Sequence, residues 1–204
     1  MNNIVMGVFG FIIIHIVDFV SLKKIPLLKP LIWISGIGLW IYSFIMICLA
    51  PDKLLLPIWS TWFGWILLTI SILVFLYALF INLPFRKTYV ATGVGDKLIK
   101  TGLYALARHP GAIWFILFML SSILVSKSSL MFIAAPIYIV LNTLLVVIQD
   151  KFFFPRMFAG YDLYQQETPM LLPNRRSINA FIESLQQAKT QNGLQGGKHN
   201  GYIR

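Results

Sequence analysis

The residues best suited to chemistry lie between Lys97 and Trp114, in a charged, glycine-bearing stretch that separates two apolar runs. Arg108, His109 and Pro110 come directly before the second of these runs. A guanidinium and an imidazole are thus placed where a helix would enter lipid, and polar groups without a function are costly there. We therefore take this stretch as the centre of a candidate site.

A second polar group of residues follows the last apolar run of the chain and includes Asp150, Tyr161 and Tyr164. If the two apolar runs between the groups form an antiparallel hairpin, Arg108 and Asp150 return to the same membrane depth. The sequence therefore predicts one site built from both segments. An Arg–Asp ion pair without chemistry would have the same sequence, and such pairs contribute only about 0–1 kcal/mol when exposed.

The residue types limit the chemistry. No serine, histidine and aspartate occur together in a motif typical of nucleophilic catalysis. Only His15 and His109 lie in segments expected to be ordered, and with the single Cys48 they do not have metal-ligand spacing, so we expect no metal site. The remaining possibility is group transfer between a soluble cofactor and a lipophilic acceptor, where positioning and desolvation supply most of the rate.

The composition is that of an integral membrane protein. Of 204 residues, 58% are hydrophobic and only 12% are charged, and the mean hydropathy is +0.77. Soluble domains are about half apolar and a quarter charged. The N-terminal apolar run lacks a basic region before it and a small-residue cleavage site after it, so it is expected to be a retained span rather than a signal peptide.

The apolar runs predict an all-α, polytopic membrane bundle of about five transmembrane helices, with a cofactor pocket on the cytosolic face. A span needs about 20 residues to cross the hydrocarbon core, so the second, third and fifth runs are long enough, and the first and fourth are marginal. The fourth and fifth are joined by the turn SKSS, which favours a helical hairpin. The five runs are Ile4 to Val20, Leu31 to Ala50, Ile58 to Leu83, Ala112 to Val125 and Leu130 to Ile148.

The basic residues agree with five spans. All 17 Lys and Arg residues except Lys53 and Lys127 fall in segments that five spans place on one side of the membrane. By the positive-inside rule, we expect the N-terminus outside and the C-terminus in the cytosol. The small size of the chain favours a bacterial plasma (inner) membrane. The net charge of +10 therefore requires no nucleic-acid partner.

Within the first run, His15 and Asp18 are three residues apart and share a helix face. They are interpreted either as a proton relay or, preferably, as a hydrogen-bonded pair packed against a neighbouring helix. In the second run, Ser35, Gly36 and Gly38 would permit close approach of another helix.

The chain divides into three regions. Residues 1–83 form a three-span scaffold, residues 84–173 contain the loop, the hairpin and the juxtamembrane segment, and residues 174–204 follow. In the last region an apolar residue recurs at Ile178, Phe181, Ile182 and Leu185, which predicts a short amphipathic surface helix with Ser177 as its N-cap. The tail from Lys189 is expected to be disordered because it is rich in Gly, Gln and Asn.

Residues 84–173 resemble the isoprenylcysteine carboxyl methyltransferase family and related small membrane methyltransferases. The resemblance is carried by GLYALARHP, an apolar hairpin, the pair QD, and YDLYQQETPMLLP. The chain departs from the family pattern at Ala112 (Tyr in the family), Trp114 (Gly) and Gln149-Asp150 (two Glu). The matching residues are Gly102, Leu103, Tyr104, Arg108, His109, Pro110, Tyr161, Tyr164, Pro169 and Pro173.

The resemblance implies a methyltransferase that uses S-adenosylmethionine. The donor would be bound from the cytosolic side, and a lipophilic or lipid-modified acceptor with a carboxylate, amine or thiol would enter from the bilayer. Arg108 and His109 are the expected catalytic residues, with Arg108 paired with the donor's carboxylate and His109 able to remove a proton from an amine. The expected cofactor-binding residues are Tyr104, Arg108, His109, Pro110, Asp150, Tyr161 and Tyr164.

Two alternatives remain open at the level of the sequence. Some membrane lipid reductases have a similar C-terminal arrangement of helices with a tyrosine-rich end, and they use NADPH. A non-catalytic accessory protein could also keep the fold with a changed pocket. Trp114 and Gln149 favour this second alternative, and the identity of the bound cofactor distinguishes all three.

Overall fold

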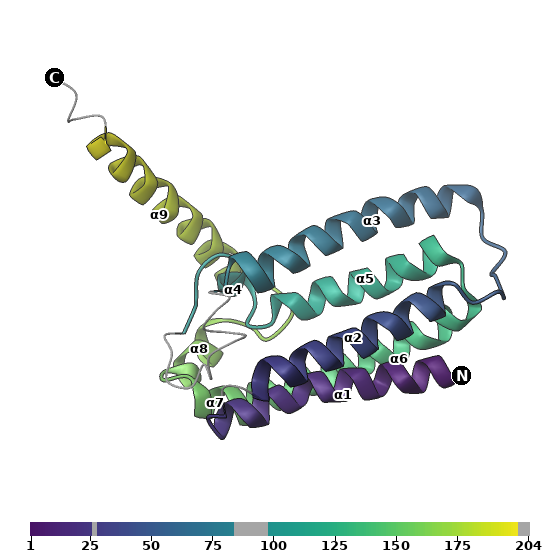
Figure 1. Cartoon of the computed structure of the whole chain (residues 1–204). Helices are drawn as coiled ribbons and strands as arrows, with labels where there is room; N and C mark the ends of the chain where they lie inside the picture. Colours follow the sequence, from purple (N-terminus) through teal and green to yellow (C-terminus); the bar gives the residue numbers. More distant parts are fainter. Residues whose placement is uncertain (26–27, 84–97, 200–204) are drawn as a thin grey trace.

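The computed structural model describes residues 1–25, 28–83 and 98–199, and this part of the chain is helical without strands (Figure 1). The helical bundle predicted from the apolar runs is therefore confirmed. The loop residues Arg86, Lys87 and Lys97, which count among the basic residues on the predicted cytosolic side, lie outside the described residues, as does residue 84, where the second predicted region begins.

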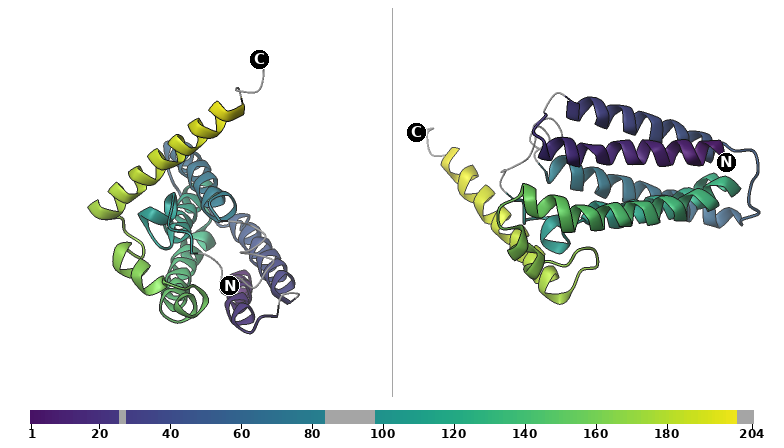
Figure 2. Two further views of the ribbon diagram at one scale, coloured as in Figure 1. Left: turned by 90° about the vertical axis from the view of Figure 1, so that its left-hand side faces the viewer. Right: turned by 90° about the horizontal axis from the view of Figure 1, so that it is seen from below.

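Five long apolar helices lie side by side (Figures 1 and 2). Four helical stretches are long and apolar enough to cross a membrane, whereas α5 is shorter, with 17 residues or about 25 Å of length. The side chains of α3 that face away from the bundle, such as Trp59 and Trp62, are exposed, as suits contact with lipid. The helices are α1 (Asn2–Leu22), α2 (Leu28–Cys48), α3 (Ile58–Leu76) with its π-helical extension η1 (Tyr77–Ile81), α5 (Pro110–Ser126) and α6 (Ser129–Ile148).

The fifth predicted span does not end at Ile148. It continues through the π-helical turn η3 (Gln149–Phe153) into α7 (Phe154–Met157), so that Ser129–Met157 is one helical stretch of 29 residues. No glycine interrupts the sequence there. Pro155, in the first turn of α7, has no N–H to donate within the stretch, and the Asp150 carbonyl accepts from Gln165 Nε2 (2.9 Å). Isolated π-helical turns are frequent at functional sites, and η3 carries Asp150.

The hairpin between α5 and α6 forms as predicted. Lys127 adopts the left-handed conformation after α5, and the Ser128 hydroxyl accepts a hydrogen bond from the Met131 N–H (3.2 Å) to cap α6. The loop that follows α2 lies against this turn, since the Leu54 N–H donates to the Lys127 carbonyl (2.7 Å). Lys53 and Lys127 are therefore together at one end of the bundle.

Reporters fused to the protein should agree with this arrangement. Within the described residues, Lys23, Arg108 and Lys151 belong to segments at the opposite end, so a reporter after Arg204 should read as cytosolic and one inserted after Lys53 as external. Paired alkaline phosphatase and fluorescent-protein fusions measure this. A cytosolic signal from both positions would contradict the five-span arrangement.

Close packing of α1 on α2 depends on two glycines. A Cβ on Gly10 would lie 2.8 Å from the Trp40 backbone nitrogen, and one on Gly36 would lie 2.8 Å from the Ile14 backbone nitrogen. Gly36 thus permits the predicted helix approach. Gly38 does not take part, because a Cβ there would meet no atom within 4 Å.

The C-terminal helix α9 (Arg175–His199) differs from the prediction in two ways. Its N-terminus is capped by Asn174, whose Oδ1 accepts from the Ser177 N–H (2.9 Å) while Ser177 Oγ accepts from the Asn174 N–H (3.0 Å), so Ser177 is the third residue of a reciprocal cap. The helix also continues past Lys189 to His199, because no proline interrupts it. It extends from beside the short helix α4 (Leu103–Leu106) away from the bundle (Figure 1).

Candidate functional site

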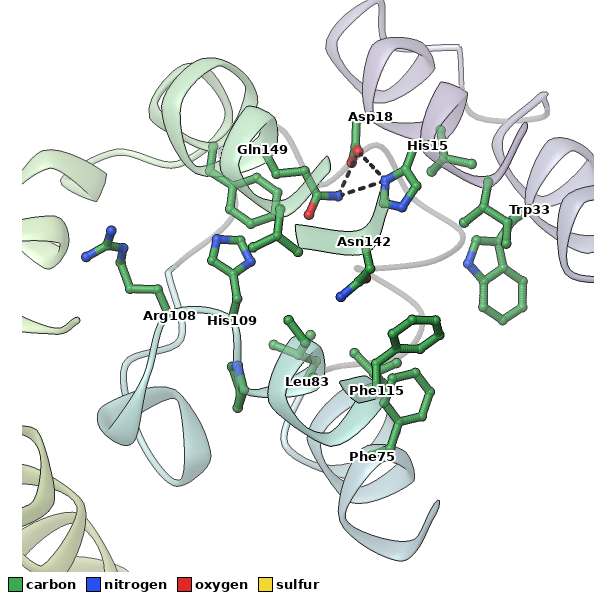
Figure 3. A pocket seen from close by; sticks show the side chains of 18 of the residues that line it. His15, Asp18, Trp33, Phe75, Leu83, Arg108, His109, Phe115, Asn142 and Gln149 are labelled. Atoms are coloured by element: carbon green, nitrogen blue, oxygen red, sulfur yellow. Dashed lines mark hydrogen bonds and ion pairs between the residues drawn. The ribbon is translucent and has the colours of Figure 1, made fainter. Parts of the chain in front are cut away.

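A cavity of about 820 Å³ lies among α1, α2, α3, α5 and α6 and reaches the short helix α8 (Tyr161–Glu167). This volume is within the roughly 300–1,000 Å³ that is usual for small-molecule sites. Most of its walls are apolar side chains from the first three helices and α5. Polar groups gather at the end where the chain enters α5 and leaves α6 (Figure 3). The cavity therefore has an apolar body and a polar end.

Arg108 and Asp150 form a buried two-point ion pair at this polar end. Arg108 Nε is 2.8 Å from Asp150 Oδ1, and Nη2 is 2.7 Å from Oδ2. Their side chains are only 9% and 5% exposed. The predicted convergence of the two segments is therefore confirmed, and the pair is buried rather than at an exposed interface.

Asp150 accepts from three other side chains as well. Tyr161 Oη donates to Oδ1 (2.6 Å), Gln165 Nε2 to Oδ2 (3.1 Å), and His109 Nε2 lies 3.2 Å from Oδ1. Only an ionised carboxylate can accept from all of these donors at once. Asp150 itself does not line the cavity, since its neighbours cover it. Asp150 therefore lies behind the polar wall and joins the side chains that form it.

Arg108 has little capacity left for a ligand. In addition to its bonds to Asp150, Nη1 donates to the Gln165 carbonyl (3.0 Å) and to the Thr168 carbonyl. Four of its five N–H groups are thus used. Burial alone would lower the pKa of Arg108, but the hydrogen bonds and charge of Asp150 raise it. The predicted pairing of Arg108 with the donor's carboxylate would therefore have one N–H group to use unless Arg108 left Asp150.

The backbone of the same turn is fixed by the segment after α8. The Arg108 N–H donates to the Pro169 carbonyl (2.9 Å), and the His109 N–H donates to the Met170 carbonyl (3.1 Å). Pro110 then begins α5, where its fixed φ and missing N–H suit the first helical position. The Arg-His-Pro turn is therefore held rigidly from two directions.

His109 faces the cavity between Arg108 and Gln149 (Figure 3). It is nearly buried, and its ring stacks on Phe154 with 5.4 Å between centroids. Because Nε2 donates to a carboxylate, the neutral ring carries its lone pair on Nδ1. His109 can therefore accept a proton at Nδ1 while Asp150 stabilises the resulting imidazolium.

The three predicted tyrosines line the same end of the cavity. Tyr164 Oη donates to the Tyr104 carbonyl (2.5 Å), and Tyr104 Oη donates to the Ala78 carbonyl (3.3 Å), which connects α8, α4 and η1. Burial, followed by the neighbouring Asp150, raises the pKa of Tyr161, and burial raises the pKa of Tyr164. Both phenols are therefore neutral hydrogen-bond donors over the physiological pH range.

On the opposite wall, Gln149 connects η3 to α1. Gln149 Nε2 donates to Asp18 Oδ2 (2.7 Å) and lies 3.4 Å from His15 Nδ1, and His15 is 3.5 Å from Asp18 (Figure 3). The predicted packing of the His15–Asp18 pair against a neighbouring helix is confirmed. Sequence reasoning missed Gln149 as its partner and missed that all three residues line the cavity.

The two other departures from the family pattern, Ala112 and Trp114, differ in whether they line the cavity. Ala112 lines the cavity, whereas Trp114 does not and so leaves the space free.

Among the residues that the structure describes, no three His, Cys, Asp or Glu side chains are placed to hold a metal ion. Comparisons of the chain with protein-family models, with curated proteins and with solved structures find no match.

Proposed function

We propose that this protein is an integral membrane methyltransferase that uses S-adenosylmethionine to methylate a lipophilic acceptor at the cytosolic leaflet. The observation that carries the proposal is the cavity, whose apolar body opens among membrane helices and whose polar end is formed by Arg108, His109, Tyr161 and Tyr164. Such a cavity suits a water-soluble donor and a lipid-soluble acceptor that must meet.

The residues at the polar end fit this donor. The aromatic side chains of Phe154, Phe158 and Tyr161 lie within 6.4 Å of one another, centroid to centroid, and offer faces for adenine and for a cationic sulfur. Asp18 and Gln149 can accept hydrogen bonds from ribose hydroxyls across the cavity. When bound, S-adenosylmethionine supplies a methyl group activated by the positive sulfur.

The chain's own residues would position the reactants and move one proton. The ion pair of Arg108 and Asp150 fixes His109 and Tyr161, and His109 Nδ1 takes the proton from an amine or thiol acceptor. A carboxylate acceptor is already ionised and requires no base. Arg108 is thus better described as a positioning residue than as a direct ligand of the donor.

The acceptor would enter sideways from the bilayer between α2 and α3. α2 packs mainly against α1, and α3 mainly against α5, so the two helices belong to different packed groups. Between them the cavity is lined by apolar side chains such as Ile37, Ile41 and Phe75. Trp33 of α2 meets Phe80 of η1 edge to face, with 6.4 Å between centroids. An apolar chain can lie there without polar contacts.

Isothermal titration of the detergent-solubilised protein with S-adenosylhomocysteine tests the proposal. We expect micromolar or tighter binding that is lost in Asp150→Ala, because the polar wall loses its common acceptor. The matched control is Asp162→Ala, an exposed acid of α8, which should keep the affinity. Binding of NADPH instead would favour a lipid reductase, and binding of neither compound would favour a non-catalytic accessory protein.

A further inference from the structure

We propose that the inner part of the cavity recognises a carbonyl oxygen within the lipophilic portion of the acceptor, through Asn142 and Trp40. That the bound molecule is the methyl acceptor rests on the proposed function. The carbonyl site adds a substrate class, namely lipids whose buried portion contains a carbonyl, as opposed to plain hydrocarbon chains.

Asn142 lies on α6 about two helical turns before Gln149, on the inner side of the polar end. Its side chain extends into the space between His109, His15 and Phe115 (Figure 3). The residue is only 9% exposed, and its Nδ2 has no hydrogen-bond partner among the described residues. An amide on an otherwise apolar stretch of wall is thus left with an unpaired donor.

Trp40 provides a second such donor from α2. Its Nε1 is buried and, within the described parts of the chain, unpaired, and the residue lines the same cavity. The ring is fixed by aromatic neighbours, with centroids 5.4 Å from Phe44, 6.0 Å from Phe115 and 6.3 Å from Tyr138. The indole therefore cannot turn to find another partner.

Two unpaired donors in one cavity, within the described residues, indicate the chemistry of the missing partner. Both are N–H groups, so the partner must accept, and a hydrocarbon chain would leave both unpaired at a depth where water is scarce. The broad terminal torsion of asparagine lets the amide turn toward a bound oxygen. Among the residues that the structure describes, the buried Thr61 hydroxyl also has no partner, but Thr61 does not line the cavity, so it does not bear on the ligand.

Two lipids that differ only in their carbonyl groups test the inference. Dioleoylglycerol carries two ester carbonyls, and its dioleyl ether analogue carries none. For the purified protein in detergent, without any nucleotide, we expect native mass spectrometry to show about three- to tenfold tighter binding of the ester. In Trp40→Phe/Asn142→Leu, which keeps the size of both side chains approximately, the ratio should fall to about one.

The matched control is Trp62→Phe, the same change at an indole that is 69% exposed on α3, and it should keep the ester preference. Equal affinity for both lipids in the wild type, binding of neither lipid, or a preference that persists in the double variant would overturn the inference. Since no methyl donor is present, the outcome is independent of the titration with S-adenosylhomocysteine. Binding of S-adenosylhomocysteine without a preference for the ester lipid would contradict the carbonyl site and leave the proposed function standing.

Discussion

Asp150→Asn should destabilise the protein by about 3–5 kcal/mol, which is typical when one partner of a buried ion pair is removed. The substitution keeps the shape of the side chain but leaves the Arg108 cation buried without a counter-charge. It also places an NH₂ group among the donors of Arg108, His109, Tyr161 and Gln165. Unfolding by denaturant in micelles measures the change, and a loss below about 1 kcal/mol would contradict the role assigned to the pair.

The chain offers a matched control for this prediction. Lys100 and Glu167 form a pair at 3.2 Å, with side chains 39% and 49% exposed, so Glu167→Gln should cost no more than about 1 kcal/mol. The double variant Arg108→Met/Asp150→Leu should be more stable than Asp150→Asn, because no unpaired charge remains, but less stable than the wild type, because Tyr161 and Gln165 lose their acceptor. It should still fail to bind S-adenosylhomocysteine, which separates the structural role of the pair from its role in the site.

His109→Gln should lower the rate of methyl transfer by about 10²–10⁴-fold for an amine or thiol acceptor. Glutamine can still donate to Asp150 from Nε2, but it has no nitrogen able to take a proton. The measurement is transfer of a labelled methyl group from S-adenosylmethionine to lipids extracted from the native membrane, with saturating donor.

The stability of His109→Gln serves as its control. We expect a thermal unfolding midpoint within a few degrees of the wild type, because the hydrogen bond to Asp150 is retained. A folded variant with an unchanged rate would show that His109 only shapes the wall. Such a result is also what an acceptor with an ionised carboxylate would give.

The helical bundle and the centre of the site could be predicted from the sequence. Apolar runs and the SKSS turn predicted the helices and the hairpin, and the hairpin brought Arg108 to Asp150. Helix ends were less predictable, since the stretch that carries Asp150 continues to Met157 through a π-helical turn, which no residue type signals. The cap of α9 was placed three residues late because Asn174 and Ser177 are both good capping residues.

The polar groups on the far wall could not be assigned from sequence. Periodicity places His15 and Asp18 on one helix face, but it does not show which helix that face meets. Gln149 was interpreted only as a departure from a family pattern, whereas it bonds to Asp18 across the cavity. Asn142 lies within an apolar run and has no neighbour in the sequence that marks it as part of a site.

The hydrogen-bond network around Asp150 and most of the apolar walls come from different parts of the chain. Within the described residues, the side chains that hydrogen-bond to the Asp150 carboxylate all follow Gly102 in the sequence, whereas α1, α2 and α3 supply most of the hydrophobic lining. A chimera that takes its first 83 residues from another protein of this architecture would inherit that protein's preference for chain length and branching. The network around Asp150 would be kept, so the preference for an acceptor can be changed within the first 83 residues, provided that His15 and Asp18 are retained to meet Gln149.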